Sequence, residues 1–275
     1  MNLAKIYDDT AEKMAKGLNA AADDYTGPDG LLYCGKCHTA KQCRVKHPFK
    51  DQIDTQTQLC KCGIEARRKA YFAQENEVKR RECFTDYKMM QYTFAADDGS
   101  NDKVLRALKS YVDNFDTFRE KGKGLLLYGP IGTGKTFAAA CVANALIDNG
   151  VSARMTDFKW IANTLLGMYG GKQAFIDNLN RYPLLIFDDL ATERKTEYMQ
   201  EIVFNFIDSR YRSGLPMIIT TNLSLEEMKN PESVAEARCY DRILERCFPL
   251  EVAGASRRRK KIIADYNETK ELLGL

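Results

Sequence analysis

The spacing of apolar residues along the chain changes near residue 101. Beyond that point, short apolar runs alternate with longer stretches in which apolar residues recur at helical spacing. Continuous apolar runs are typical of parallel strands buried on both faces, and helices between such strands cover the sheet. The expected fold class is therefore α/β, with strands at 124–129, 151–157, 183–189, 216–222 and 248–252.

The region before residue 101 has a mixed pattern. Residues 1–22 predict an amphipathic helix that the turn sequence TGPDG at 26–30 ends, and a cysteine-rich segment follows. Residues 65–83 predict a charged helix with few large apolar side chains. We expect an N-terminal helix and cysteine module at 1–70, a charged helical connector at 71–100 and an α/β domain at 101–275.

Composition narrows the class of protein. With 44% hydrophobic and 29% charged residues among 275, most of the chain is expected to form one or two globular domains. The formal net charge is only +3, so attraction to nucleic acid would depend on local clusters such as SRRRKK at 256–261. We find no apolar run of about 18 residues and no secretory signal near the start, so we expect a cytoplasmic protein without a membrane span.

The sequence GPIGTGKT at 129–136 fits the phosphate-loop pattern G-x-x-x-x-G-K-[ST] in full. An apolar strand precedes it and a helical stretch follows it, which is the context that the pattern requires. Backbone N–H groups at the helix start would face phosphate oxygens, Lys135 would neutralise phosphate charge, and Thr136 would offer a hydroxyl to Mg²⁺. The alternative is a glycine-rich turn that binds nothing. The candidate ATP-binding residues are Gly129, Pro130, Ile131, Gly132, Thr133, Gly134, Lys135, Thr136 and Phe137.

Polar residues follow two further apolar strands. LLIFDD ends in Asp188 and Asp189, which is typical of a Walker B strand whose acids lie beside the phosphate loop. We expect Asp188 to bind Mg²⁺ and Asp189 to polarise the attacking water. Asn222 ends IITTN at another strand end, where an amide can reach the γ-phosphate or the water. The alternatives are a helix-capping acid pair and an ordinary turn asparagine.

Five of the nine cysteines lie between Cys34 and Cys62. Cys-x-x-Cys followed by a second close pair predicts a tetrahedral structural zinc site. The free energy of zinc binding would explain how such a short polar segment folds. A redox pair and free thiols are the alternatives, and His38, Cys43 and His47 compete as ligands. The predicted Zn²⁺ ligands are Cys34, Cys37, Cys60 and Cys62.

The order of these motifs, with ARCYDRILERC at 237–247 after them, resembles the AAA+ ATPases. Within them, the chain is most similar to the DnaC/DnaI-type replicative helicase loaders and their relatives, the IstB transposition helper ATPases. The resemblance covers about residues 90–260. It implies a P-loop domain with a parallel sheet between helices and no lid domain, since only about 30 residues follow Arg242.

The resemblance also implies roles for two arginines. Arg242, in CYDRI, matches the arginine finger, which reaches the ATP of a neighbouring subunit, and Arg258, in GASRR, matches the sensor 2 arginine. A surface helix with ion pairs to Asp241 and Glu245 is the alternative for Arg242. Many AAA+ enzymes carry Glu where this chain has Asp189, so slow ATP hydrolysis is expected. With an arginine finger supplied by a neighbour, hydrolysis is also expected to depend on assembly or DNA.

The function that the resemblance implies is ATP-dependent loading of a hexameric, DnaB-like replicative helicase onto single-stranded DNA. A zinc module ahead of the ATPase is similar to DnaI-type loaders, whereas IstB proteins usually lack one; an IstB-like transposition helper remains the alternative. The implied partners are the helicase, single-stranded DNA and further copies of the chain. The helix at 1–22 and the cysteine module would dock the helicase, or the helix packs on the module.

Four residues match positions that contact single-stranded DNA in related loaders. An aromatic ring can stack on a base, and lysine can neutralise a phosphate. The alternative for each is an ordinary surface residue. The candidates implied by the resemblance are Tyr169, Lys172, Thr196 and Tyr198.

Overall fold

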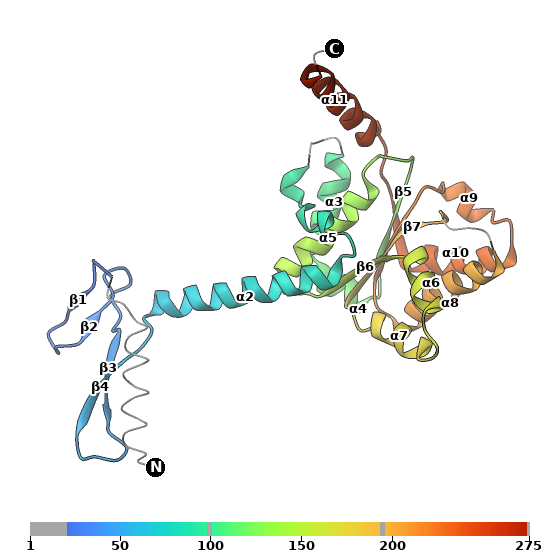
Figure 1. Ribbon diagram of the computed structural model, residues 1–275. Helices are drawn as coiled ribbons and strands as arrows, with labels where there is room; N and C mark the ends of the chain where they lie inside the picture. Colours follow the sequence, from blue (N-terminus) through green and yellow to red (C-terminus); the bar gives the residue numbers. More distant parts are fainter. Residues whose placement is uncertain (1–20, 98, 100, 193–195, 274–275) are drawn as a thin grey trace. The chain divides into compact units, whose positions relative to one another are not determined.

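The computed structural model describes residues 21–97, 99, 101–192 and 196–273 (Figure 1). The helix predicted over residues 1–22 lies almost entirely outside the described residues. The chain divides into two units, residues 1–75 and residues 76–275. None of the described helices combines the length and hydropathy that a bilayer crossing requires.

The described part of the first unit consists of two small antiparallel hairpins and the start of a long helix. Among the described residues of this unit, few side chains are buried, and they include Cys34, Cys60 and His47. A core of this size does not normally hold a fold without a metal or a disulfide. Its elements are β1 (Tyr25–Thr26), β2 (Leu32–Tyr33), β3 (Gln42–Lys46), β4 (Ile53–Thr57) and the first part of α2 (Lys61–Cys83).

The helix predicted over residues 65–83 is confirmed as part of α2. Its second half belongs to the α/β unit, where Lys79 donates a hydrogen bond to the carbonyl of Gly150 at 2.9 Å. Cys83 and Phe84 are buried in the core of that unit. Part of the predicted connector is therefore packed structure, and two 3₁₀ helices follow it: η1 (Tyr87–Gln91) and η2 (Phe94–Ala96).

A five-stranded sheet forms the centre of the second unit. Every pairing in it is parallel, as the continuous apolar runs predict. The strand order is β6-β7-β8-β5-β9, so β8 lies between the two strands that lead to the predicted ATP site. The strands are β5 (Gly124–Tyr128), β6 (Ala153–Asp157), β7 (Leu184–Leu190), β8 (Met217–Thr221) and β9 (Cys247–Glu251).

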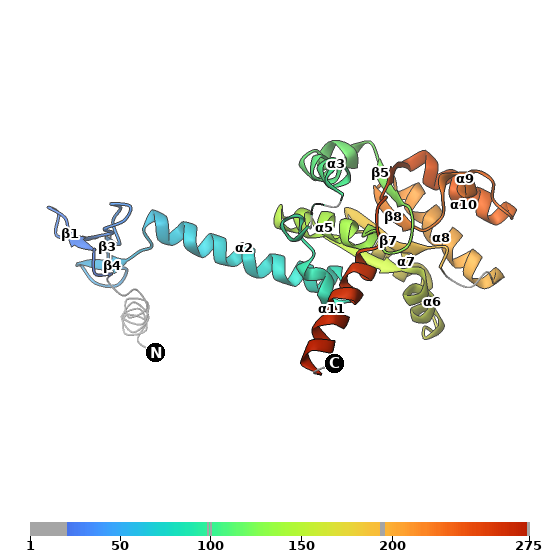
Figure 2. The ribbon, with the colours of Figure 1, turned by 90° about the horizontal axis from the view of Figure 1, so that it is seen from above.

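Helices cover both faces of this sheet (Figure 1 and Figure 2). Alternate residues of one strand face opposite sides, and Leu125 and Leu127 of β5 join one core cluster while Leu126 joins the other. The first cluster includes α3 (Asp102–Asp113), α4 (Phe115–Glu120) and α5 (Lys135–Asp148). The second includes α6 (Phe158–Leu166), α7 (Lys172–Leu179), α8 (Glu197–Ser213), α9 (Leu225–Lys229) and α10 (Val234–Arg246). The predicted α/β sandwich is confirmed, and a single described helix, α11 (Arg257–Leu272), follows β9 in place of a lid.

A buried arginine holds the loops at the far end of the sheet from the predicted ATP site. Arg210 has no solvent-exposed surface, and burial lowers its pKa to about 9. Its guanidinium donates hydrogen bonds to the carbonyls of Asn180, Tyr182, Pro183 and Pro216. These residues precede β7 and β8, so one side chain satisfies the backbone where both strands begin.

Candidate ATP and metal sites

The phosphate loop joins β5 to α5. Three of its glycines have positive φ angles: 140° at Gly129, 84° at Gly132 and 101° at Gly134. These conformations are accessible to glycine and strained for other residues. They turn the chain directly into α5, which begins at Lys135 and leaves its first N–H groups free of intrahelical partners. The loop therefore has the geometry of an anion-binding helix N-terminus.

Lys135 links this loop to the end of β8. Its Nζ donates to the carbonyls of Gly129 and Pro130, both at 2.8 Å, and to Oδ1 of Asn222 at 2.7 Å. Burial lowers the pKa of Lys135, while Asp189 and Asp188 oppose this effect. The ammonium group is thus held by neutral carbonyl oxygens, which phosphate oxygens can replace with a stronger charge-assisted bond.

Thr136 and Asp188 lie in direct contact. The Thr136 hydroxyl donates to Oδ1 of Asp188 at 3.0 Å. Burial raises the pKa of Asp188 to about 6, although the hydroxyl groups of Thr220 and Thr136 partly oppose this effect. A hydroxyl and a carboxylate are oxygen ligands of the kind that Mg²⁺ binds, so the two residues fit the metal role predicted for them.

A pocket of about 520 Å³ lies in front of the loop. Its lining brings together phosphate-loop residues, Asp189, Asn222 and Arg258, which the sequence predicts for one site. It also contains residues that were not predicted, among them Met89 and Arg257. The lining residues are Asp86, Met89, Tyr92, Ile131, Gly132, Gly134, Lys135, Thr136, Phe137, Asp189, Asn222, Arg257 and Arg258.

One wall of the pocket is tied to α5 by a buried amide. Nδ2 of Asn144 donates to the carbonyls of Met89 and Tyr92, both at 2.9 Å. The Tyr92 and Phe137 rings lie 5.3 Å apart between centroids. Apolar and aromatic groups beside a phosphate loop are suited to a nucleotide base. Asn144 is the kind of residue that sequence reasoning could have singled out, as one polar side chain within an apolar helix.

Arg257 crosses the phosphate loop from the start of α11. Its backbone N–H donates to the carbonyl of Gly132 at 2.9 Å, and its guanidinium pairs with Asp97 at 2.7 Å. The same group lies 5.1 Å from the centre of the Phe137 ring. Arg257 therefore ties together three segments around the pocket, while Arg258 is exposed at its edge.

Arg242 does not belong to the described lining of this pocket. It lies on α10, and its Nη2 atom pairs with Oδ1 of Asp208 on α8 at 2.7 Å. The sequence suggested Asp241 and Glu245 as ion-pair partners of Arg242. In the described structure, its partner is Asp208. Glu245 instead accepts a hydrogen bond from the Tyr211 hydroxyl at 2.9 Å.

The four predicted DNA contacts lie in two segments away from the described pocket lining. Tyr169 is fully exposed in the loop between α6 and α7, and Lys172 is exposed at the start of α7. Tyr198 is 41% exposed on α8. The Thr196 hydroxyl accepts the N–H of Met199 at 3.3 Å as the N-cap of α8, which is a structural role that the sequence reasoning did not assign.

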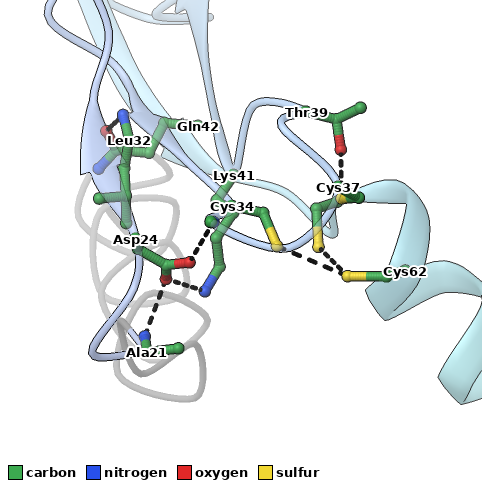
Figure 3. A network of polar contacts seen from close by, with 11 residues as sticks. Ala21, Asp24, Leu32, Cys34, Cys37, Thr39, Lys41, Gln42 and Cys62 are labelled. Atoms are coloured by element: carbon green, nitrogen blue, oxygen red, sulfur yellow. Dashed lines mark hydrogen bonds and ion pairs between the residues drawn. The ribbon is translucent and has the colours of Figure 1, made fainter.

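The four predicted zinc ligands converge in the first unit, and Figure 3 shows three of them, Cys34, Cys37 and Cys62, side by side. The sulfur atoms of Cys34, Cys37, Cys60 and Cys62 all lie within 4.8 Å of one another. Zinc–sulfur bonds of about 2.3 Å in a tetrahedron place sulfurs about 3.8 Å apart, so this set fits Zn²⁺ after small adjustments. The first pair lies in the turn after β2, and the second flanks the start of α2.

Ionisation of the cluster also favours a bound cation. The Thr39 hydroxyl lowers the pKa of Cys37 to about 5, whereas contact with the sulfurs of Cys60 and Cys34 raises the pKa of Cys62 to about 12. Four neighbouring thiolates repel one another unless a cation lies between them. A divalent metal ligated by all four would remove that repulsion.

The competing ligands lie elsewhere in the first unit. His47 is buried, and its Nδ1 accepts the N–H of Phe49 at 3.0 Å. His38 contacts the hydroxyl of Tyr25 through Nδ1 at 3.3 Å, and Cys43 lies within β3 opposite Gln56. None of the three belongs to the four-sulfur cluster found among the described residues.

A family model described as "IstB-like ATP binding protein" matches residues 34–264. The replicative helicase loader DnaI of Bacillus subtilis is 30% identical over 181 residues, which cover 60% of this chain and 58% of that protein. An ATP-binding protein ascribed to an insertion sequence in Sinorhizobium fredii is 31% identical over 153 residues, which cover 53% of this chain and 50% of that protein. The chain thus spans about half the length of these relatives.

A solved structure of a DnaI protein has a similar fold. A crystal structure of DnaI superimposes with a TM-score of 0.54 and 24% identity, and the match covers 65% of this chain and 98% of that chain. At this identity, the likeness shows the fold and nothing about activity. It agrees with the AAA+ architecture that the motif order predicted.

Proposed function

Because the chain belongs to the IstB-like ATP binding protein family, we propose that it is an ATPase that loads a hexameric replicative DNA helicase onto single-stranded DNA. The observation that carries this proposal is the presence of two sites in one chain. A phosphate-loop pocket lies in the α/β unit, and a four-cysteine cluster lies ahead of it. The pocket is common to loaders and transposition helpers, whereas the cysteine module resembles DnaI-type loaders.

The pocket supports ATP binding through residues that are already placed. The N–H groups at the start of α5 would bind phosphate oxygens, and Lys135 would exchange the carbonyls of Gly129 and Pro130 for them. Thr136 and Asp188 would hold Mg²⁺, which supplies neutralisation of phosphate charge when it is bound. Asp189 and Asn222 line the pocket where they can orient the attacking water.

Hydrolysis would be completed by a second copy of the chain. Arg242 is absent from the described lining of its own pocket, and it lies on a different element from the phosphate loop. A guanidinium supplied by a neighbour stabilises charge on the transferred phosphoryl group. In this proposal, ATP is hydrolysed only when copies of the chain assemble, and the Asp188–Asp189 pair makes turnover slow.

The remaining roles are proposed for the two units separately. The first unit, with Zn²⁺ on the four cysteines, docks the helicase, and the second unit, residues 76–275, binds ATP and DNA. Tyr169 and Tyr198 would stack on bases, and Lys172 would neutralise a phosphate. The exposure of all three side chains supports these assignments.

Transposition help is the second candidate function. The chain is 31% identical to an insertion-sequence ATP-binding protein and 30% identical to the loader DnaI. The similar identities support a role in transposition as the second candidate. Such a protein would share the ATP pocket and act on a transposase complex in place of a helicase.

Native mass spectrometry of the chain with the replicative helicase from its own genome tests the proposal. With ATP and Mg²⁺, we expect a discrete complex of one helicase hexamer with several copies of the chain. The variant Lys135→Ala separates the nucleotide requirement from docking. A folded, zinc-containing protein that forms no complex with the helicase, but does bind a transposase from the same genome, would refute the loader in favour of the second candidate.

A further inference from the structure

Thr220 lies inside the sheet, directly behind the two acids of the ATP site. It belongs to β8, which pairs with β5 on one side and with β7 on the other. Its side chain has no solvent-exposed surface, and it stands opposite Leu127 of β5. The residue is not among those that line the described pocket.

The pairing of β7 with β8 is irregular at this point. Phe187 pairs with Ile219 and Leu190 pairs with Thr221, so two residues of β7 oppose the single residue Thr220. Two residues facing one is the definition of a β-bulge. The two residues opposite Thr220 are Asp188 and Asp189, so the one extra residue of the bulge falls within the pair of acids.

The second acid has an unusual backbone conformation. Asp189 has a φ angle of 56°, in the left-handed region that few residues other than glycine adopt. Its N–H donates to Oγ1 of Thr220 at 2.8 Å, where a regular strand would offer a backbone carbonyl. A side-chain oxygen therefore satisfies the backbone group that the bulge displaces.

The same hydroxyl holds the first acid. Thr220 donates its only hydroxyl proton to Oδ1 of Asp188 at 2.6 Å, and Thr136 donates to that oxygen as well. A threonine hydroxyl has one donor and two acceptor positions. Thr220 uses the donor on Asp188 and an acceptor on Asp189, so one side chain orients both acids.

We propose that Thr220 is the positioning residue of this ATP site: its hydroxyl stabilises the bulge that holds Asp188 against the metal position and aims Asp189 into the pocket. This inference rests on the proposed ATPase function. Loss of the hydroxyl removes a donor from one acid and an acceptor from the other at once. Groups that orient metal ligands from behind typically change metal affinity or activity by about 10–100-fold when mutated.

Two isosteric comparisons isolate the hydroxyl. Thr220→Val keeps the shape of the wild-type side chain, and Thr220→Ala keeps the shape of Thr220→Ser. Thr156 offers a matched control, because it is a buried threonine on β6 whose hydroxyl has no hydrogen-bond partner among the described residues. Thr156→Val therefore shows how much the loss of a buried threonine hydroxyl changes Mn²⁺ binding and hydrolysis when that hydroxyl contacts no acid.

The measurement is binding of Mn²⁺, followed by electron paramagnetic resonance, to the full chain saturated with a non-hydrolysable ATP analogue. Binding of the analogue itself is measured by fluorescence, and hydrolysis of ATP in a single turnover. We expect Thr220→Val and Thr220→Ala to weaken Mn²⁺ binding by about 10–100-fold and to slow hydrolysis, with analogue affinity within about threefold of wild type. Thr220→Ser and Thr156→Val should stay within about threefold in all three.

The outcomes distinguish the positioning role of Thr220 from the proposed ATPase function. Wild-type Mn²⁺ binding in both Thr220→Val and Thr220→Ala would overturn the positioning role while leaving the ATPase intact. An equal loss in Thr220→Ser and Thr220→Ala would also overturn it, because the effect would then follow side-chain size. If Thr220→Val does not fold, the Ser and Ala pair decides alone. Failure of the wild-type chain to bind the analogue would overturn the proposed function, and this inference with it.

Discussion

Arg242 on α10 forms an ion pair with Asp208 on α8, with 2.7 Å between Nη2 and Oδ1. The guanidinium also lies 4.7 Å from the centre of the Phe204 ring. The side chain keeps 27% of its surface exposed, so a second anion can approach it. In an assembly, the guanidinium would exchange one anion, a carboxylate of its own subunit, for another, the phosphates bound by a neighbour.

Arg242→Ala should leave ATP affinity unchanged and reduce assembly-dependent hydrolysis by about 10³-fold or more, because the transferred phosphoryl group loses its guanidinium partner. The measurement is steady-state hydrolysis as a function of protein concentration. Arg212→Ala is the control, since Arg212 pairs with the other oxygen of Asp208 at 2.5 Å and is 73% exposed. Full turnover in Arg242→Ala, or an equal loss in Arg212→Ala, would contradict the finger assignment.

Asp188→Asn should stabilise the protein when nucleotide and metal are absent. Burial raises the pKa of Asp188 from 3.8 to about 6, so the folded state binds more protons than the unfolded state between these values. Stability therefore falls as the pH rises through that window, by up to about 3 kcal/mol, and the loss is complete above it. The asparagine keeps an acceptor for Thr136 and removes the buried charge.

The check is urea denaturation of both proteins at pH 8 and at pH 5 in a metal chelator. The stabilisation by asparagine should be largest at pH 8 and smaller at pH 5. Adding Mg²⁺ and ATP should reverse the order, since the wild-type protein gains ligand binding energy that the variant lacks. A variant less stable than wild type at pH 8 without ligands would be inconsistent with a penalty from the buried carboxylate.

Cys37→Ser should lose bound zinc and unfold the first unit, because three thiolates hold the metal less tightly and the described part of the unit has few buried side chains. Cys43→Ser is the matched control, as Cys43 lies on β3 outside the cluster. Zinc is measured per chain by elemental analysis, and folding of the unit by amide exchange. Retention of one zinc in Cys37→Ser, or its loss in Cys43→Ser, would point to a different ligand set.

Arg210→Met should destabilise the α/β unit by about 3–5 kcal/mol, since buried carbonyls left without donors cost about 1–3 kcal/mol each. The carbonyls concerned belong to Asn180, Tyr182, Pro183 and Pro216. Methionine fills much of the space, so the effect reports the lost hydrogen bonds more than a cavity. Urea unfolding measures it, and a change below about 1 kcal/mol would show that water or rearranged loops replace the guanidinium.

The sheet and the phosphate loop could be predicted from the sequence because their signals are local. Strands buried on both faces are continuous apolar runs, and four of the five strands appeared where such runs were found, while β6 (Ala153–Asp157) appeared at the weaker candidate VSARMTD. The loop needs glycines with positive φ angles followed at once by lysine, and this requirement is written in consecutive residues. The cysteine pairs are similarly local, although their convergence depends on the hairpins between them.

The contacts that complete the site could not be predicted, because their partners are far apart in sequence. Asp97 and Arg257 are separated by 160 positions, and nothing in either neighbourhood indicates the other. Thr220 gave no signal of its own, since a threonine in an apolar strand is an ordinary strand residue. Its role depends on the bulge at Asp188 and Asp189, which appears only when β7 and β8 are paired.

The most direct test of the account is helicase loading onto a circular single strand of DNA, which a closed ring cannot reach by threading over an end. The replicative helicase from the same genome is incubated with the circle, ATP and Mg²⁺, and the helicase that co-elutes with DNA is measured. The account predicts loading that requires this chain and is lost with Lys135→Ala and with Cys37→Ser. Equal amounts of helicase on the circle with and without the chain, under conditions where the chain binds ATP, would contradict it.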